Sequence, residues 1–160
     1  MSKSLKRVRA ALEAAQISTE IIETPLARTA SDAAAAIGCH IDQIAKSIIF
    51  RGDLSGTAIL FITAGGNTVD ADKAAQLAGE PLGKADAALI RAQTGFAIGG
   101  VSPVGHVTPI KAFFDPRLMD FDQIWAAAGT PHHVFGASPQ DICTISNAEL
   151  SDFKKQSDFM

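Results

Sequence analysis

The chain has 160 residues, 47% of them hydrophobic and 19% charged, with a formal net charge of −3 at pH 7. This composition is typical of a globular protein and excludes a disordered chain, and no apolar run reaches the ~20 residues of a membrane-spanning helix. The net charge also excludes a protein that holds nucleic acid through a strongly basic surface, so any contact with nucleic acid has to be local.

The organisation is that of one domain over residues 1–160, because no linker, repeat or low-complexity segment interrupts the chain. Cys39 and Cys143 share no short spacing, so neither a disulfide framework nor a zinc knuckle is indicated, and we expect a protein of the reducing cytoplasm. The basic N-terminus lacks the continuous apolar block of a signal peptide and predicts a helix instead.

This first helix is predicted to be amphipathic. Its core-facing positions are Leu5, Val8, Leu12 and Ala15. Lys3, Lys6 and Arg7 lie together on another face, which is the obvious local source of positive charge. On its own this basic face indicates a solvated helix surface, and it becomes a candidate for contact with RNA only if another feature points to RNA.

The first half of the chain then predicts a capped helix followed by a hairpin. In chain order the expected elements are a short strand at 20–24, a helix at 29–38, a helical turn at 41–45, and strands at 46–51 and 57–64. Thr29 is the expected N-cap of the helix, and Gly38 is its expected end. A glycine-rich turn joins the last two strands, which should therefore pair antiparallel.

The second half predicts short helices and further strands. The expected elements are helices at 71–77 and 85–93, strands at 95–100, 109–114, 122–128 and 132–136, and a last helix that begins at Ser138 and Pro139. Strands outnumber long helices, and the hairpin implies antiparallel pairing. The expected fold class is therefore α+β, with a mixed, partly closed sheet surrounded by short helices.

The sequence GGVSPVGH at residues 99–106 places glycines, a serine and a histidine directly after an apolar run. A phosphate-binding P-loop is excluded, because His106 and Val107 replace the lysine and hydroxyl that should follow its last glycine. A nucleophile elbow is excluded, because Pro103 follows Ser102 and has no backbone N–H for an oxyanion. No HxH, HxxxH or CxxC pair is present, so no metal site is expected. Two interpretations stay open: a tight bend, or a loop that presents backbone N–H groups to a ligand carbonyl.

Lys46 stands at the start of the apolar strand Lys-Ser-Ile-Ile-Phe. Burying an ammonium group without a partner is costly, so one interpretation is a strand-end lysine that extends outward to solvent. The other is a cation at the mouth of a pocket, where it faces a phosphate or a developing negative charge.

Together these segments carry a resemblance to a known family. The helix TASDAAAAIG is followed by QIAKSIIFR, TAILFITAGGNTVD, TGFAIGGVSPVGH and IWAAAGTPHHVF. This order resembles the YbaK/ProX-type aminoacyl-tRNA deacylases, which are relatives of the editing domain of bacterial prolyl-tRNA synthetases. The resemblance extends from about Thr29 to Pro139, and its most specific parts are Lys46 in its strand and the Gly-x-x-x-Pro loop from Gly99 to Pro103.

The resemblance implies a compact, β-barrel-like sheet and an enzyme that hydrolyses the ester between a wrong amino acid and tRNA, most often tRNA(Pro). The implied partners are the acceptor end of aminoacyl-tRNA and prolyl-tRNA synthetase, for a protein that is a monomer or a weak homodimer. No cofactor is implied, because an ester is already activated and hydrolysis needs only a positioned water and a stabilised oxyanion.

Carried over to this sequence, the resemblance assigns a site. The expected catalytic residues are Lys46, Gly99, Gly100 and His132. The expected substrate-binding residues are Thr29, Ser47, Val101, Ser102, Pro103 and His133. Of the two histidines, His132 is the first choice and His133 the second, because the sequence does not fix which one faces inward. Lys3, Lys6 and Arg7 become candidates for contact with the tRNA backbone.

Ser47 departs from the family pattern, in which alanine-editing members tend to have Asn and cysteine-editing members Thr. The amino acid removed therefore stays open among Ala, Cys, Ser, Thr and 2-aminobutyrate. One alternative is a non-catalytic tRNA- or synthetase-binding module of the same fold, and another is a hydrolase of a different small ester or thioester. An open pocket bordered by Lys46 and the glycine loop would favour an enzyme over the binding module.

Overall fold

The structure of the protein is a computed structural model that describes residues 2–156. Its α-helices are α1 (Lys3–Ala14), α2 (Ala30–Ile37), α3 (Ala71–Ala78), α4 (Ala87–Thr94) and α5 (Pro139–Ile145). Two short 3₁₀ helices are η1 (Ile41–Gln43) and η2 (Pro116–Asp120). The strands are β1 (Ile21–Glu23), β2 (Ile44–Gly52), β3 (Ala58–Ala64), β4 (Leu82–Lys84), β5 (Lys111–Phe114), β6 (Ile124–Ala127), β7 (His133–Ala137) and β8 (Glu149–Leu150).

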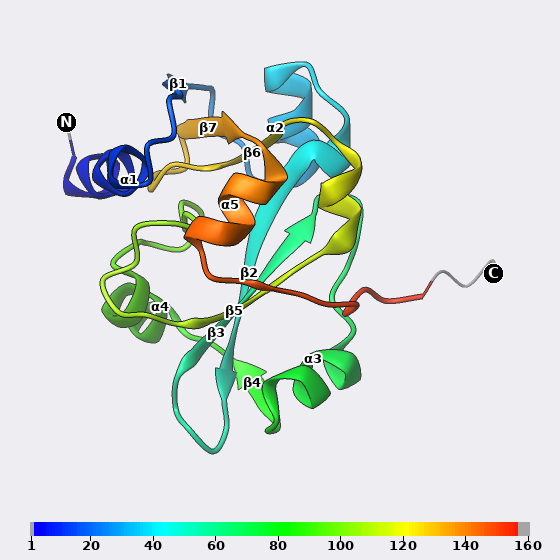
Figure 1. The fold of residues 1–160 in the computed structure, drawn as a ribbon. Coiled ribbons are helices and arrows are strands. Elements are labelled where there is room, and N and C mark those ends of the chain that lie inside the picture. The colour runs from blue at the N-terminus through cyan, green and yellow to red at the C-terminus, as the bar shows by residue number, and fades with distance from the viewer. Residues whose placement is uncertain (1, 157–160) are drawn as a thin grey trace.

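Within residues 2–156, one mixed sheet of eight strands organises the fold (Figure 1). Its strands follow the order β1-β7-β6-β2-β3-β5-β8, and β4 pairs with the end of β2 off this path. β2 and β3 form the expected antiparallel hairpin, whereas β2 with β6 and β3 with β5 pair parallel. The predicted α+β class, with a mixed sheet and short helices, is confirmed, and hydrogen bonds do not close the sheet into a barrel.

Side-chain caps explain where the helices begin. Thr29 Oγ1 accepts the N–H of Asp32 at 3.1 Å at the start of α2, and Gly38 ends this helix with a φ of +85°. Asp70 and Ser138 cap α3 and α5 in the same way. These bonds satisfy N–H groups that have no partner within the helix, so a few residues of local sequence decide each helix start.

The predicted strand at 95–100 is wrong, because these residues form bends and a turn. Gly95 ends α4 with a φ of +84°, and Gly99 turns the chain again with a φ of +94°, so no extended segment remains between them. The apolar character of this segment serves instead to bury Phe96, whose side chain has no exposed surface.

Smaller differences concern element boundaries and two short strands. η1 ends at Gln43 and β2 already begins at Ile44, so the helical turn predicted at 41–45 is too long. β4 and β8 were not expected; they are three and two residues long, and the Gly-Lys end of β4 disfavours a strand locally. Both strands form because a neighbouring strand offers hydrogen-bonding groups, which a local pattern does not reveal.

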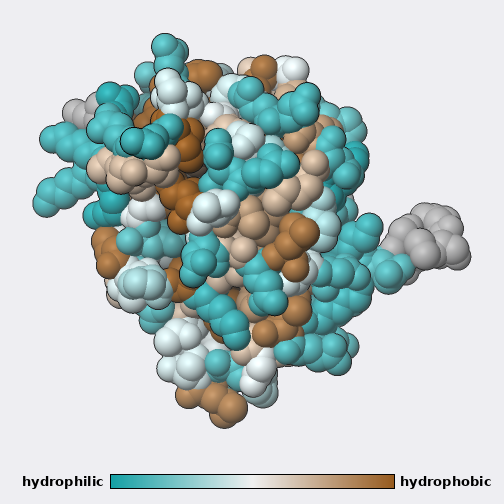
Figure 2. All heavy atoms as spheres, in the orientation of Figure 1, coloured by the Kyte–Doolittle hydropathy of each residue, from teal (hydrophilic) through white to brown (hydrophobic). Residues whose placement is uncertain are grey.

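The two faces of the sheet are covered by separate clusters of hydrophobic side chains. β3 is buried over its whole length and contributes Leu60 and Ile62 to one face and Phe61 to the other. The larger cluster is covered by α1, α4 and α5, and the smaller one by α3. At the surface shown in Figure 2, apolar side chains form separate patches among hydrophilic ones. No helix within residues 2–156 is long and apolar enough to cross a bilayer.

Phe61→Ala is expected to lower the free energy of unfolding by about 3–5 kcal/mol, because it leaves a cavity in the smaller cluster. The Phe61 ring is fully buried, stacks on Phe113 at 5.1 Å between ring centroids, and meets Phe50 and Phe153 edge-on. Urea denaturation measures the loss. Leu54→Ala is the control, since Leu54 is 80% exposed in the turn between β2 and β3. A Phe61→Ala protein as stable as its parent would contradict this account of the core.

Candidate functional site

The sheet opens beside the middle of β2. This strand pairs with β6 only at Ile44 and Ala45, and with β4 only from Phe50 to Gly52. Residues 46–49 therefore have a ladder partner on the β3 side alone. A cavity of about 460 Å³ lies at this gap, bounded by β2, β6 and β7, by the segment before α2 and by the loop at 98–101.

Ser47 presents polar groups to the gap. Backbone groups alternate in direction along a strand: Gly52 N–H donates to Thr57 O across the hairpin, whereas Asp53 N–H donates to Pro81 O on the opposite side, both at 2.9 Å. By this alternation the N–H and C=O of Ser47 face away from β3, between the two ladders. The Ser47 Oγ is buried and has no hydrogen-bond partner within residues 2–156. Ser47 thus brings unpaired donors and acceptors to the cavity wall.

Lys46 also lines the cavity, and its side chain is half-buried. Its Nζ donates to the Gly65 carbonyl at 3.2 Å. Burial lowers the pKa of Lys46 below its ordinary value, while the carboxylates of Asp115 and Asp42 act in the opposite direction. Because an ammonium has three donors, the bond to Gly65 leaves N–H groups that can reach a ligand in the cavity.

The glycine loop contributes Gly99 and Val101 to the cavity wall. Gly100 does not line the cavity: it packs so closely on Thr130 that a Cβ would lie 2.6 Å from Thr130 Cα, and its N–H donates to Ala97 O at 3.1 Å. The N–H groups of Gly99 and Val101 make no hydrogen bond within residues 2–156. The loop therefore leaves two backbone donors available beside the cavity.

Ser102 and Pro103 are buried and lie outside the cavity lining. The Ser102 Oγ accepts the Val104 N–H at 3.1 Å, and the Ser102 carbonyl contacts His106 Nε2 at 2.7 Å. The ring of His106 packs edge-on against Phe96. These contacts hold the loop from behind, so Ser102 and His106 support its shape without bordering the cavity.

The two neighbouring histidines differ in position. His133 begins β7 and lines the cavity, with its Nδ1 2.6 Å from Thr130 Oγ1. His132 is exposed in the preceding turn, does not line the cavity, and donates its backbone N–H to Thr130 Oγ1 at 3.1 Å. The geometry therefore brings His133, the second choice of the sequence, to the cavity.

Several lining residues were not singled out from the sequence. Thr29 was expected and lines the cavity, but so do its neighbour Arg28 and Trp125 of β6, which were not expected. Trp125 is the only tryptophan of the chain and stands among alanines, a signal that could have marked it. Within residues 2–156 no three His, Cys, Asp or Glu side chains come together to hold a metal ion.

The basic residues of α1 are not equivalent. Lys3 and Lys6 are exposed. Arg7 is partly buried, donates from Nη1 to Gly95 O at 3.2 Å, and lies over the Phe96 ring with 5.4 Å between Cζ and the ring centroid. Arg7 thus joins α1 to the segment before the glycine loop, whereas the two lysines keep their charges in solvent.

His106 is expected to make the protein less stable at low pH. Burial lowers the pKa of His106 below its ordinary value of 6.5, so the unfolded chain binds this proton more readily than the folded protein. The free energy of unfolding should therefore decrease as the pH falls below about 6.5. His106→Gln, which can still donate to Ser102 O, should weaken this pH dependence in urea denaturation. His132→Gln is the matched control, and an equal effect of both substitutions would contradict the expectation.

Comparison with known proteins identifies the family of this chain. The aminoacyl-tRNA editing domain family matches residues 24–145. The chain is 30% identical to the uncharacterised protein YwhH of Bacillus subtilis (strain 168) over 122 residues, which are 76% of this chain and 77% of that protein. It is 42% identical to a candidate trans-editing enzyme for prolyl-tRNA synthetase, with a TM-score of 0.89 over 98% of this chain and 99% of the other. A scaffold protein for computational grafting of linear epitopes is 40% identical, with a TM-score of 0.90 over 98% of this chain and 100% of the other. The chain belongs to the aminoacyl-tRNA editing domain family.

Proposed function

We propose that the protein is a trans-editing deacylase, which hydrolyses the ester of a mischarged amino acid on tRNA. The proposed substrate is tRNA(Pro) carrying a small non-cognate residue: Ala, Cys, Ser, Thr or 2-aminobutyrate. The observation that carries the proposal is the open cavity, which Lys46, Ser47, Gly99 and Val101 border together; the amides of Gly99 and Val101 and the Ser47 Oγ have no hydrogen-bond partner within residues 2–156. An open cavity of this kind supports an enzyme over a non-catalytic binding module.

The proposed reaction needs no nucleophilic side chain. A water molecule attacks the ester carbonyl carbon, the carbonyl oxygen gains negative charge, and the bond to the ribose oxygen then breaks. The products are the free amino acid and a tRNA whose terminal ribose hydroxyl has taken up a proton. The amides of Gly99 and Val101 are the proposed donors to the oxyanion, since the Gly100 N–H is used within the turn. Lys46 would bind the charged or carbonyl oxygens of the substrate.

His133 is the proposed polar residue that orders the attacking water. It lies on the cavity wall, and its Nδ1 contacts Thr130 Oγ1 at 2.6 Å, which fixes the orientation of the ring. A neutral imidazole held in this way has its second nitrogen free to exchange a hydrogen bond with water. Ser102 has no role in the proposed chemistry beyond holding the loop.

Ser47 and its neighbours are proposed to select the amino acid. Ala45, Ala126 and Val101 make much of the wall small and apolar, which suits a short side chain. The unpaired groups of Ser47 would bind a polar group of the substrate, because a buried polar atom without a partner costs free energy. Cognate proline would be excluded by its size and shape.

Lys46→Ala is expected to reduce deacylation of the mischarged tRNA by about 100-fold or more, because it removes the cation proposed to hold the substrate's oxygens. The measurement is deacylation of tRNA(Pro) charged with Ala, Cys, Ser, Thr or 2-aminobutyrate, with Pro-tRNA(Pro) as the cognate reference. Lys84→Ala is the matched control, since Lys84 is an exposed lysine at the end of β4. Unchanged rates in Lys46→Ala would remove Lys46 from the mechanism, and a wild-type protein inactive on the whole panel would refute the proposed function.

The double variant Lys3→Ala, Lys6→Ala is expected to bind tRNA more weakly and to lower the slope of log K against log salt by about 1.5, as two phosphate contacts would. Both side chains are exposed on α1. Filter binding at several salt concentrations measures the slope. Lys73→Ala is the control, because Lys73 lies on α3 and pairs with Asp152 at 3.4 Å. A slope equal to that of the wild type would identify the α1 face as solvated surface only.

A further inference from the structure

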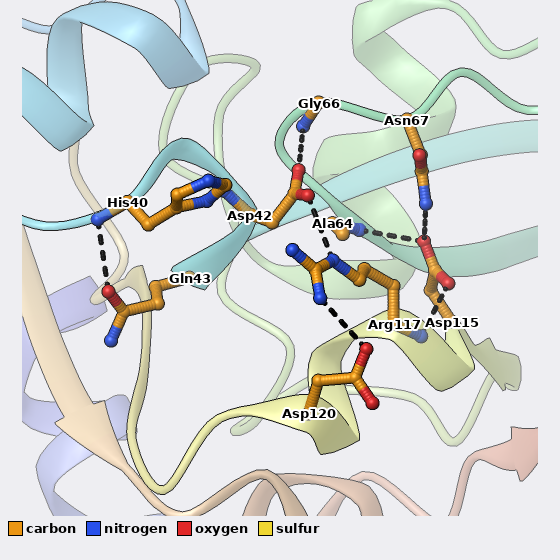
Figure 3. A network of polar contacts seen from close by, with 9 residues as sticks. All are labelled: His40, Asp42, Gln43, Ala64, Gly66, Asn67, Asp115, Arg117 and Asp120. Carbon is orange, nitrogen blue, oxygen red and sulfur yellow. Dashed lines mark hydrogen bonds and ion pairs between the residues drawn. The ribbon is translucent and has the colours of Figure 1, made fainter.

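The turn after β3 is held from two sides by carboxylates that are distant in the sequence (Figure 3). From η1, Asp42 Oδ1 accepts the Gly66 N–H at 2.8 Å. From the end of β5, Asp115 Oδ2 accepts the Ala64 N–H at 3.0 Å and Asn67 Nδ2 at 2.9 Å. Between these anchored positions lies Gly65, whose carbonyl accepts the Lys46 ammonium.

Arg117 joins the two carboxylates to each other. Its Nε donates to Asp42 Oδ2 at 2.9 Å, and its backbone N–H donates to Asp115 Oδ1 at 3.0 Å (Figure 3). On its solvent side, Arg117 Nη1 donates to Asp120 at 2.9 Å, and Asp120 is 59% exposed. Asp120 therefore shares Arg117 with Asp42, but within residues 2–156 its side chain makes no hydrogen bond to the turn.

The Gly65 carbonyl has little freedom to move. A Cβ at Gly65 would overlap Ile41 O, and one at Gly66 would overlap Asp42 Oδ1, so the turn is enclosed by η1 and its aspartate. An acceptor fixed in this way fixes the direction of the lysine that donates to it. The alternative, a lysine extending outward to solvent, would need no such partner.

Within residues 2–156 the Asp115 carboxylate accepts no hydrogen bond from a cation. Asp115 is 2% exposed, and its three bonds come from two backbone N–H groups and one amide. Burial lowers the pKa of Lys46, whereas the negative charges of Asp115 and Asp42 attract the lysine ammonium and raise its pKa.

We propose that Asp42, Asp115 and Arg117 form a lysine clamp, a positioning network that holds the Lys46 ammonium at the cavity through the Gly65 carbonyl and keeps it charged. The clamp's consequence for catalysis rests on the proposed function, whereas its effect on Lys46 does not. None of its three residues lines the cavity, so they act on the substrate only through Lys46.

Two other residues that line the cavity together with Lys46 can carry positive charge: Arg28, from the segment before α2, and His133, from β7. Positive charge on either one disfavours a charged lysine. The carboxylates of η1 and of the β5–η2 junction are therefore the groups that can preserve the ammonium, and their removal should be felt directly at Nζ.

The test compares Asp42→Asn and Asp115→Asn with the matched control Asp120→Asn. The pKa of Lys46 is measured in each protein by ¹³C NMR of lysines labelled at Cε, with Lys46→Arg to assign the signal. Both clamp variants should lower this pKa, and Asp120→Asn should leave it unchanged. On mischarged tRNA, the clamp variants should reduce kcat by about tenfold or more with KM changed less than about threefold, and the alkaline limb of the pH profile should move to lower pH.

The outcomes separate the clamp from the proposed function. A Lys46 pKa that is unchanged in folded Asp42→Asn overturns the clamp, even if activity falls. If the clamp variants lower the Lys46 pKa but the wild-type protein has no deacylase activity, the clamp is supported and the proposed function is refuted. If Asp115→Asn fails to fold, Asp42→Asn decides the question alone, because the Asp42 side chain is 16% exposed and lies at the edge of the core.

Discussion

The separation of β2 from β6 after Ala45 is the constraint on which the rest of the site depends. β2 is nine residues long and pairs with β3 along most of its length, so it keeps its direction while β6 leaves it. A strand edge with free polar groups is commonly protected by a helix or loop that covers it. Here α2, β7 and the glycine loop enclose the edge of β2 but leave a cavity, whose wall contains backbone donors and acceptors.

Arg7 and Lys46, two cations near the glycine loop, differ in their partners within the protein. The Arg7 guanidinium donates to the Gly95 carbonyl and lies over the Phe96 ring, so it helps to pack α1 against this segment. Lys46 has a single carbonyl partner and distant carboxylates, so its remaining N–H groups and its charge are available to a ligand. The cost of burying a cation is thus offset by a carbonyl and an aromatic ring at Arg7, but by a single carbonyl and more distant carboxylates at Lys46.

The sequence predicted most features that depend on a few adjacent residues. Thr29 caps α2 through a hydrogen bond to Asp32, and the apolar runs of β2 and β3 pair as a hairpin across a short turn. The strand expected at 95–100 failed because its apolar residues serve to bury Phe96 between two glycine turns. The pairing of Asp42 with Arg117 could not be predicted, since the two lie 75 positions apart and meet only once β3, η1 and η2 have packed.

Asp115 shows which contacts of one residue the local sequence predicts and which it does not. An aspartate directly before a proline is a common helix start, and Asp115 does cap η2 ahead of Pro116. Its second oxygen, however, bonds to Ala64 and Asn67, and nothing near Asp115 in the sequence indicates this. Likewise, which of His132 and His133 lines the cavity depends on where the preceding turn ends and β7 begins. Two adjacent identical side chains do not reveal this position.

The position of Trp125 has an optical consequence. The chain contains one tryptophan and no tyrosine, and the tryptophan lies on the cavity wall, where β6 meets β2. Almost all of the near-ultraviolet fluorescence of the protein therefore originates at the cavity. An indole in this place changes its emission when water is displaced beside it. The intrinsic fluorescence of the protein should therefore report whether a ligand occupies the cavity.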